Sequence, residues 1–305
     1  MASKAYELIA GIRDLLMIDG TGEDTKILRR LNDAQWKVYH ANPNWRGLQG
    51  YPTTTTSDGV SYVAMPSTLH HIYDVRQTST SPETQLKYVS PSEFHKIIPQ
   101  PTTFAEGSPT YYSLWGERLW LYPIPDATYT LTIYGYLKPV SCKVYSTGTS
   151  QHSSTTVTGT STYFSTNANV DTTMFYAYQA DVRSDGTYPW STISAVTNAT
   201  AMTISAYSGG SGSAAIAYAA SSASTFPEQF DWLLKVTAAL MMSGRLREQE
   251  LFIKWLLEEE RKALASLIDS ETYVPDFKPV LEDFRQVSEL PSGNDYMYPF
   301  IFRDR

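Results

Sequence analysis

Residues 107–139 read GSPTYYSLWGERLWLYPIPDATYTLTIYGYLKP, and this stretch decides the fold that we expect for the chain. It predicts three strands, Thr110–Trp115, Arg118–Tyr122 and Tyr129–Tyr136. In the third strand apolar residues alternate with threonines, and a period of two is typical of a strand with one buried face. Gly116-Glu117 can form a tight turn between the first two strands. The stretch therefore predicts an antiparallel sheet.

Two helices are predicted before this sheet. Residues 4–18 carry apolar side chains at helical spacing, and Gly20 and Gly22 interrupt that pattern. A second helix is expected after Thr21, with acidic residues in its first turn, where the helix dipole favours them. Asn42-Pro43 ends this helix, because proline cannot continue a helical hydrogen-bond pattern.

Turn signals follow the second predicted helix. Asp58-Gly59 lies between the runs TTTT and VSYVAM and predicts a two-residue hairpin turn. A short helix is expected to begin at residues 91–94. Together with the quoted strands, these signals predict that residues 45–140 form one small antiparallel sheet.

Residues 144–225 differ in composition, since they are rich in Ser and Thr and contain few charged residues. Such a composition can mark a disordered linker. However, short alternating apolar runs, among them residues 175–178 and 202–204, predict strands. We therefore expect a small inserted β-domain. The chain is expected to enter and leave it through flexible segments, residues 145–156 and 219–225.

The C-terminal part returns to helical periodicity and then loses it. Residues 226–270 carry apolar stripes at helical spacing, beginning near Pro227. The acidic run Glu258-Glu259-Glu260 precedes two basic residues and predicts a solvated helix face. Residues 271–305 contain four prolines, which exclude a long helix. Their many aromatic side chains should pack on the chain's own body, a sister subunit or another partner.

These segments together predict an α+β fold. A helical bundle combines residues 1–42 with 226–270 and packs with the small antiparallel sheet, an all-β domain is inserted, and an extended C-terminal tail follows. The predicted parts are the helices and sheet of the core (1–143), the inserted domain (144–225), the helices that complete the core (226–270) and the tail (271–305).

Composition excludes several kinds of site and partner. The chain has 305 residues, a net charge of −7 and one cysteine, Cys142, which we expect to be buried. A lone cysteine excludes an internal disulfide and a cysteine-built zinc site, and the five histidines lack metal-binding spacing, so we expect no metal and no cofactor. No apolar run approaches the roughly 18 residues that span a bilayer. We expect no signal peptide and no membrane partner, and synthesis in a reducing cytoplasm.

Motifs for catalysis are absent from the sequence. It contains no phosphate loop, no dinucleotide fingerprint and no nucleophile elbow. The glycine-rich residues 208–213 lie between short β runs, which favours a turn over a phosphate site. We therefore expect that the chain is not an enzyme. The aromatic pairs around Trp115 and Trp120 could stack on sugars or bases, but packing in the sheet and core is the favoured interpretation.

The order of segments resembles a known family. The chain carries, in succession, RRLNDAQWKVYHANPNWRGL (29–48), SYVAMPSTLHHIYDVR (61–76), KYVSPSEFHKII (87–98), the quoted strands (107–139) and FPEQFDWLLKVTAALMM (226–242). This succession resembles the head-to-tail adaptor (connector) proteins of tailed bacteriophages. The central block of the resemblance consists of Pro109, Tyr112, Gly116, Leu119, Leu121, Tyr122, Pro123, Pro125 and Asp126. The Ser/Thr-rich insertion departs from the family pattern.

The resemblance implies a structural virion protein. Such adaptors form a homo-oligomeric ring, usually a dodecamer, that joins the portal protein to a tail protein, either a nozzle, a hub or a tail terminator. The ring lines a channel through which double-stranded DNA passes without specific contacts. It would lie in the neck of the virion, between head and tail, after assembly in the cytoplasm of the bacterial host.

The resemblance also implies that an extended terminus reaches the portal. We therefore expect residues 271–305 to act as a portal clamp, with aromatic anchors and with arginines that pair with acidic groups. The predicted clamp residues are Tyr296, Tyr298, Phe300, Phe302, Arg303 and Arg305.

Two alternatives stay open at this stage. A carbohydrate-binding or adhesin-like tail module would use the Ser/Thr/Tyr-rich insertion and Trp190, which we expect to be exposed. The C-terminal arm could instead pack back on its own helices. The copy number, the tail type, the partner of the inserted domain and the oligomeric state before assembly are not determined by the sequence.

Overall fold

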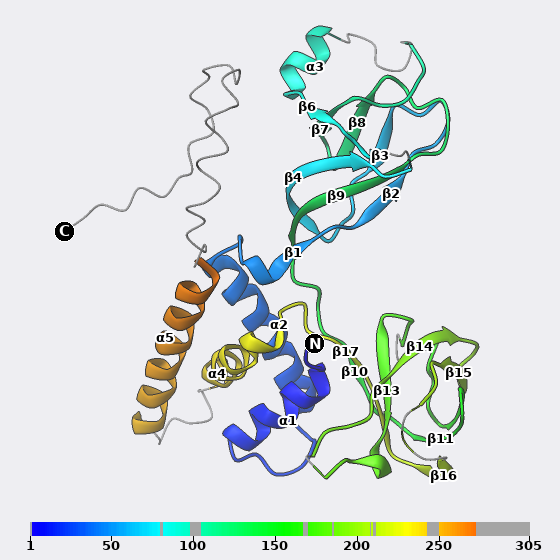
Figure 1. Ribbon diagram of the computed structural model, residues 1–305. Coiled ribbons are helices and arrows are strands. Elements are labelled where there is room, and N and C mark those ends of the chain that lie inside the picture. The colour runs from blue at the N-terminus through cyan, green and yellow to red at the C-terminus, as the bar shows by residue number, and fades with distance from the viewer. Residues whose placement is uncertain are drawn as a thin grey trace, which may run out of the picture. The chain divides into compact units, whose positions relative to one another are not determined.

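A computed structural model describes residues 2–79, 82–97, 105–166, 170–184, 186–207, 209, 212–242 and 250–272 (Figure 1). Residues 1–271 form one compact unit. Helices and largely antiparallel sheets occur together in this unit, so the predicted α+β class is confirmed. The predicted tail lies outside the described residues from residue 273 onward. The predicted division into four parts stays a prediction.

Long helices lie where the apolar spacing predicted them, at both ends of the described chain. They are α1 (Ala5–Leu15), α2 (Asp24–Ala41), α4 (Asp231–Met241) and α5 (Glu250–Thr272), with the short turn η3 (Glu228–Phe230) after Pro227. Leu8 of α1, Leu31 of α2 and Leu234 of α4 belong to one hydrophobic cluster. Leu267 brings α5 into the same cluster. Burial of one stripe on each helix is the main stabilising contribution for helices of this length.

The residues predicted as one small sheet form two sheets instead. The first has the order β1-β9-β4-β5, with β2 also paired to β9. Its strands are β1 (Gln49–Gly50), β2 (Thr53–Thr55), β4 (Leu69–Gln77), β5 (Thr84–Gln85) and β9 (Thr130–Leu137), and η1 (Arg46–Leu48) precedes them. The second has the order β3-β8-β7-β6. It contains β3 (Tyr62–Ala64), β6 (Lys87–Tyr88), β7 (Tyr111–Trp115) and β8 (Arg118–Tyr122), and α3 (Pro91–Ile97) follows β6.

Two predictions about this region are wrong. β7 and β8 do form a hairpin through Gly116-Glu117, but β9 leaves them and joins the other sheet, and β6 runs parallel to β7. Asp58-Gly59 does not close a hairpin, because β2 pairs with β9 whereas β3 pairs with β8. A tight turn allows the chain to stay in one sheet, whereas the longer connection at residues 123–129 allows it to change sheets.

The two sheets share one hydrophobic cluster. Val75, Leu131 and Ile133 of the first sheet pack with Leu119 and Leu121 of the second. Side chains alternate across a strand, so the residues between these buried positions point away from the shared core. The two outer faces therefore lie on opposite sides of a two-layer sandwich.

The Ser/Thr-rich residues form an eight-stranded sheet with the order β10-β17-β13-β14-β15-β12-β11-β16. The strands are β10 (Val144–Tyr145), β11 (Thr149–Ser153), β12 (Thr156–Thr160), β13 (Met174–Tyr178), β14 (Ser191–Val196), β15 (Ala201–Ile204), β16 (Gly212–Ile216) and β17 (Tyr218–Ser222), with η2 (Gln179–Asp181) after β13. Val157, Phe164, Tyr176 and Tyr218 belong to its hydrophobic cluster. The alternating runs therefore indicated strands correctly.

The expected flexible entry and exit segments are wrong. Residues 145–156 contain β11, and β17 includes the buried residues Ala219 and Ala220. β17 lies between β10 and β13, so its small side chains are internal. Low charge and small residues are typical of a linker, but here the small residue Ala220 belongs to one buried cluster with Tyr176 and Tyr218.

The eight-stranded sheet is attached to α1 by several polar contacts. The backbone N–H of Tyr6 donates to Oγ of Ser221 (3.0 Å), and Nε2 of Gln179 donates to the Tyr6 hydroxyl (2.8 Å). Nε1 of Trp190 donates to Oε1 of Glu7 (2.8 Å). Lys4 forms a β-bridge with Ala223. These contacts join the N-terminal helix to the sheet within the compact unit.

Candidate interaction surfaces

The predicted portal-clamp residues lie outside the described part of the chain. Tyr296, Tyr298, Phe300, Phe302, Arg303 and Arg305 all follow residue 272, where the described chain ends. The described residues nevertheless present aromatic surfaces suited to partner contacts, and these surfaces are built by the sandwich of residues 49–137.

The outer face of the first sheet depends on two β-bulges in β4. This strand reads LHHIYDVRQ, with apolar residues three positions apart at Leu69, Ile72 and Val75. The register against β9 shifts between Leu69 and His71 and again between Ile72 and Asp74. Each bulge inserts one extra residue, so the apolar residues all remain on the core side. The bulges thereby place additional polar and aromatic side chains outward.

Gly135 of β9 makes one bulge possible. A Cβ atom at this position would lie 2.1 Å from the carbonyl oxygen of His71. Real Cβ atoms do not approach a backbone oxygen so closely, so a larger residue would push the strands apart. The glycine therefore fixes the local register on which the outer face depends.

Tyrosines gather on this outer face, which we call the tyrosine face (Tyr51, Tyr73, Tyr134 and Tyr136). The rings of Tyr73 and Tyr136 have centroids 4.9 Å apart, and those of Tyr51 and Tyr134 are 6.3 Å apart. Tyr73 is 52% exposed. Partial burial and its hydrogen bond to Tyr136 raise the pKa of the Tyr73 hydroxyl to about 12, so it remains protonated at neutral pH. Neutral amphipathic rings of this kind are enriched in protein interfaces.

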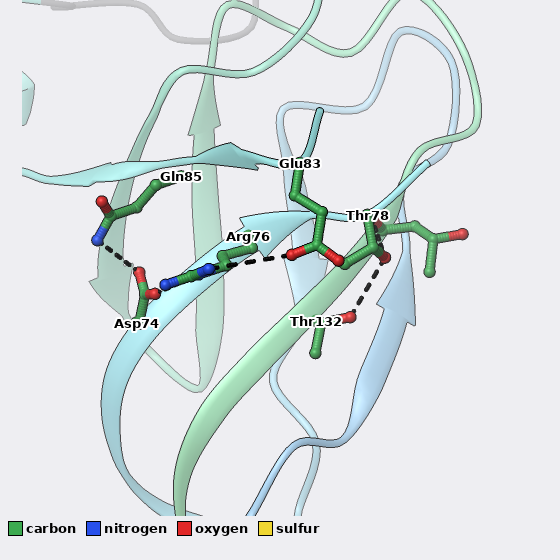
Figure 2. Close-up of polar contacts among 7 residues, drawn as sticks. Asp74, Arg76, Thr78, Glu83, Gln85 and Thr132 are labelled. Atoms are coloured by element: carbon green, nitrogen blue, oxygen red, sulfur yellow. Dashed lines mark hydrogen bonds and ion pairs between the residues drawn. The ribbon is translucent and has the colours of Figure 1, made fainter. Parts of the chain in front are cut away.

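A polar network borders the tyrosine face (Figure 2). Nε of Arg76 lies 2.7 Å from Oδ2 of Asp74, and Nη1 of Arg76 lies 4.0 Å from Oε2 of Glu83. Gln85 donates a hydrogen bond to Asp74 (2.9 Å). The Arg76 guanidinium also lies 5.5 Å from the Tyr134 ring. Two carboxylates thus share one cation, and this border carries a net negative charge.

The second sheet has an aromatic outer face as well, which we call the tryptophan face (Tyr62, Trp115, Arg118 and Trp120). The register pairs Tyr62 with Trp120 and Trp115 with Arg118, which places all four on one side. The guanidinium carbon of Arg118 lies 4.2 Å from the Tyr62 ring centroid, a cation–π contact. Trp115 is 57% exposed.

The expectation that these aromatics serve sheet and core packing is therefore only partly met. Tyr112 is buried in the shared core, whereas Tyr111 and Trp115 are exposed. The alternation in YYSLW and RLWLY already contained the signal, since every second residue had to face outward. Sequence reasoning weighed residue type and did not assign a face to each ring.

A third aromatic group lies on the C-terminal helices. The ring of Trp255 on α5 stacks on Phe252 (5.6 Å) and contacts Trp232 of α4 (6.4 Å). Trp255 and Leu251 are exposed. This group therefore belongs to neither the tyrosine face nor the tryptophan face, which are both formed by strands.

The predicted solvated acidic run on α5 is correct for only part of its length. Glu258 pairs with Arg261 (3.1 Å) and Lys262 (3.9 Å) at the surface. Glu260 instead points inward, where it accepts hydrogen bonds from Lys37 of α2 (2.7 Å) and Thr237 of α4 (2.8 Å). Because each residue of an α-helix is rotated by about 100° from the one before it, the third acid of the run points about 200° away from the first.

Two further single-residue expectations can be compared with the structure. Cys142 is buried as predicted, and burial raises the pKa of its thiol to about 11, which makes it a poor nucleophile. Trp190 is not exposed as predicted, because it is half-buried and bonded to Glu7. The glycan-binding alternative therefore loses one of its two supports, and the Ser/Thr/Tyr-rich insertion remains the other.

The exposed aromatic rings of these surfaces suit them to partner contact. Among the described residues, no group of three or more His, Cys, Asp or Glu side chains is placed to hold a metal ion. In the same part of the chain, none of the helices is long and apolar enough to cross a membrane. Flat sheet faces with partly exposed Tyr and Trp rings can bury large areas without losing much side-chain entropy.

Comparison with known proteins gives one family match. Residues 3–153, just under half of the chain, match the family model described as SU10 adaptor protein. The matched region contains α1, α2 and both aromatic sheet faces. No curated protein matches the chain. The match indicates a phage adaptor-type protein. It supports the adaptor part of the expected resemblance and does not test the head-to-tail position.

Proposed function

We propose, taking a phage adaptor-type protein as the premise, that this chain is a non-enzymatic virion protein whose ring joins the portal to the tail. The observation that carries the proposal is the family match over residues 3–153, which contain both exposed aromatic faces. An adaptor must bind unlike partners on its two sides and also its own copies, so it needs several contact surfaces. The same proposal has three further parts. The ring lies in the neck of the virion, it assembles in the cytoplasm of the host, and a nozzle, hub or tail-terminator protein docks on it.

The proposed ring consists of copies related by rotation. A head-to-tail contact uses two different patches on each copy and closes into a ring when the rotation is suitable. The number of twelve copies comes from the resemblance described above. Net charge supports the proposed DNA channel, since a chain with a net charge of −7 would not retain phosphates tightly. A strongly basic lumen in the assembled ring would contradict the conduit.

The first experiment is mass determination of the purified protein, alone and mixed with portal rings free of detergent. We expect a defined assembly whose number of adaptor copies matches the portal ring. Binding to the portal gains free energy from many repeated contacts, so partial rings should be rare. A chain that stays monomeric and ignores portal rings would contradict the adaptor proposal.

The portal clamp remains part of the proposal. Tyr296, Tyr298, Phe300 and Phe302 would insert as apolar anchors, and Arg303 and Arg305 would pair with acidic portal groups. Deletion of residues 292–305 should abolish portal binding and leave the thermal midpoint of the remaining chain unchanged. The matched control replaces only Arg303 and Arg305 by Gln, which should weaken binding and increase its salt dependence. Full portal binding after the deletion would refute the clamp.

A further inference from the structure

The sandwich presents two different aromatic surfaces on opposite sides of one core. The tyrosine face lies outside the first sheet and the tryptophan face outside the second, and both inner faces meet in the shared cluster. A head-to-tail ring contact requires two unlike patches that point in different directions on each copy. Apart from Tyr51, the residues of both faces lie on strands, so their side chains are held by the backbone ladder rather than by loops.

Charges on the two faces are complementary. At the tyrosine face Asp74 and Glu83 share the single cation of Arg76, which leaves one negative charge in excess. At the tryptophan face Arg118 contacts the Tyr62 ring, and no acid among the described residues pairs with it. An Arg118 guanidinium from a second copy would offer the cation that the two carboxylates lack. Such complementarity fixes the register of an interface and rejects like faces.

We propose that the tyrosine face of one copy binds the tryptophan face of the next copy, with Arg118 directed toward Asp74 and Glu83. This inference rests on the proposed ring and specifies its subunit contact. The occupant of each face is therefore a second copy of this chain. Tyr and Trp rings supply the buried area, as in other interfaces where a few aromatic anchors dominate the binding energy.

The test uses two full-length variants, each with one damaged face. The tyrosine-face variant is Tyr73→Ser with Glu83→Arg, and the tryptophan-face variant is Trp115→Ser with Arg118→Glu. Tyr163→Ser with Arg183→Glu is the matched control, because it also removes one exposed aromatic ring and reverses one exposed charge, outside both faces. Thermal midpoints verify that each variant folds.

Native mass spectrometry is then run under the conditions in which the wild-type protein assembles. Each face variant alone should be monomeric, because loss of an aromatic anchor and a charge pair weakens one contact by about 30-fold or more. An equal mixture of the two variants should give heterodimers through the one undamaged pair of faces. Larger assemblies should be rare, because the two faces that stay free have both lost their aromatic anchor, although their reversed charges are complementary. The control variant should assemble like the wild type.

Four outcomes would overturn the proposal. Ring formation by either face variant alone would show that the contact lies elsewhere, while the proposed adaptor function would stand. Homodimers of the tryptophan-face variant would show that the tyrosine face binds itself. A mixture without heterodimers would show that the faces bind a portal or tail protein instead. If the wild type never assembles, even with portal rings, the ring itself is wrong and this inference fails with it.

A charge exchange keeps the test valid where the serine variants are unstable. Arg118→Glu and Glu83→Arg should each prevent assembly as single changes. The chain that carries both should assemble again, because the new cation on one face meets the new acid on the next copy. Failure of the double variant to recover assembly, when both single variants fold, would contradict the assigned register.

Discussion

Gly135 is the residue on which the pairing of β4 with β9 depends. Gly135→Ala should lower the free energy of unfolding by on the order of 3 kcal/mol, because the added Cβ would overlap the His71 carbonyl. Chemical denaturation monitored by tryptophan fluorescence measures the change. Gly22→Ala is the control, since nothing lies within 4 Å of its Cβ position. An equal stability change in both variants would mean that the bulge is not constrained.

His152 is a titratable residue in an apolar setting. It is buried among the rings of Tyr176, Tyr178 and Tyr207, and neither of its ring nitrogens has a hydrogen-bond partner in the described structure. Its Nε2 lies 3.9 Å from Oδ2 of Asp181. Burial lowers the pKa of His152, and the nearby Asp181 carboxylate offsets only part of that effect. Folding therefore disfavours protonation of this imidazole.

Acidification should destabilise the chain through His152. The unfolded chain takes up a proton near the ordinary histidine pKa of about 6.5, whereas the folded chain resists it. Stability is therefore full above this pH and is lost as the pH falls below it. The free energy of unfolding should decrease from about pH 7.5 to about pH 5.5. His152→Gln should make that decrease shallower, and an unchanged pH slope would contradict the assignment.

At the scale of the elements, Glu260 decides how α5 is held. Glu260→Ala should lower the free energy of unfolding by about 1–2 kcal/mol, because Lys37 and Thr237 lose their shared acceptor. The change in the thermal midpoint measures it. Glu258→Ala on the same helix is the matched control and should cost less than about 0.5 kcal/mol, since its ion pairs are exposed. Equal costs would mean that the inward contacts of Glu260 contribute nothing.

Periodicity located the helices well but described β4 poorly. In α1 and α2 the spacing of apolar residues matches the buried stripe, because the period of 3.6 residues per turn is constant along each helix. In β4 the apolar residues recur every third position, which is neither a regular strand pattern nor a full helical one. The two bulges explain this spacing, and one of them depends on the absence of a side chain at Gly135 of β9.

At the scale of the whole molecule, contacts of α1 attach the eight-stranded sheet. Tyr6 and Glu7 bond to Ser221, Gln179 and Trp190. The wild-type chain should therefore unfold in one cooperative step across residues 1–271. In the variant Tyr6→Ala with Glu7→Ala, the eight-stranded sheet should unfold at a lower temperature than the helices. Calorimetry should then record two unfolding transitions in place of one. Glu7→Gln, which keeps an acceptor for Trp190, is the control, and a single transition in the double variant would contradict the coupling.

The sequence by itself determined the α+β class, the positions of the helices and most strands, and the likeness to phage adaptors. These properties depend on local spacing and on the order of segments, which a sequence contains directly. The tertiary structure decided which strands share a sheet, that the Ser/Thr-rich ends are internal strands, and that Glu260 and Trp190 face inward. It also decided that aromatic side chains divide into two opposite outer faces. These properties depend on contacts between residues far apart in the chain, and no local pattern specifies the partner of a strand or the neighbour of a helix.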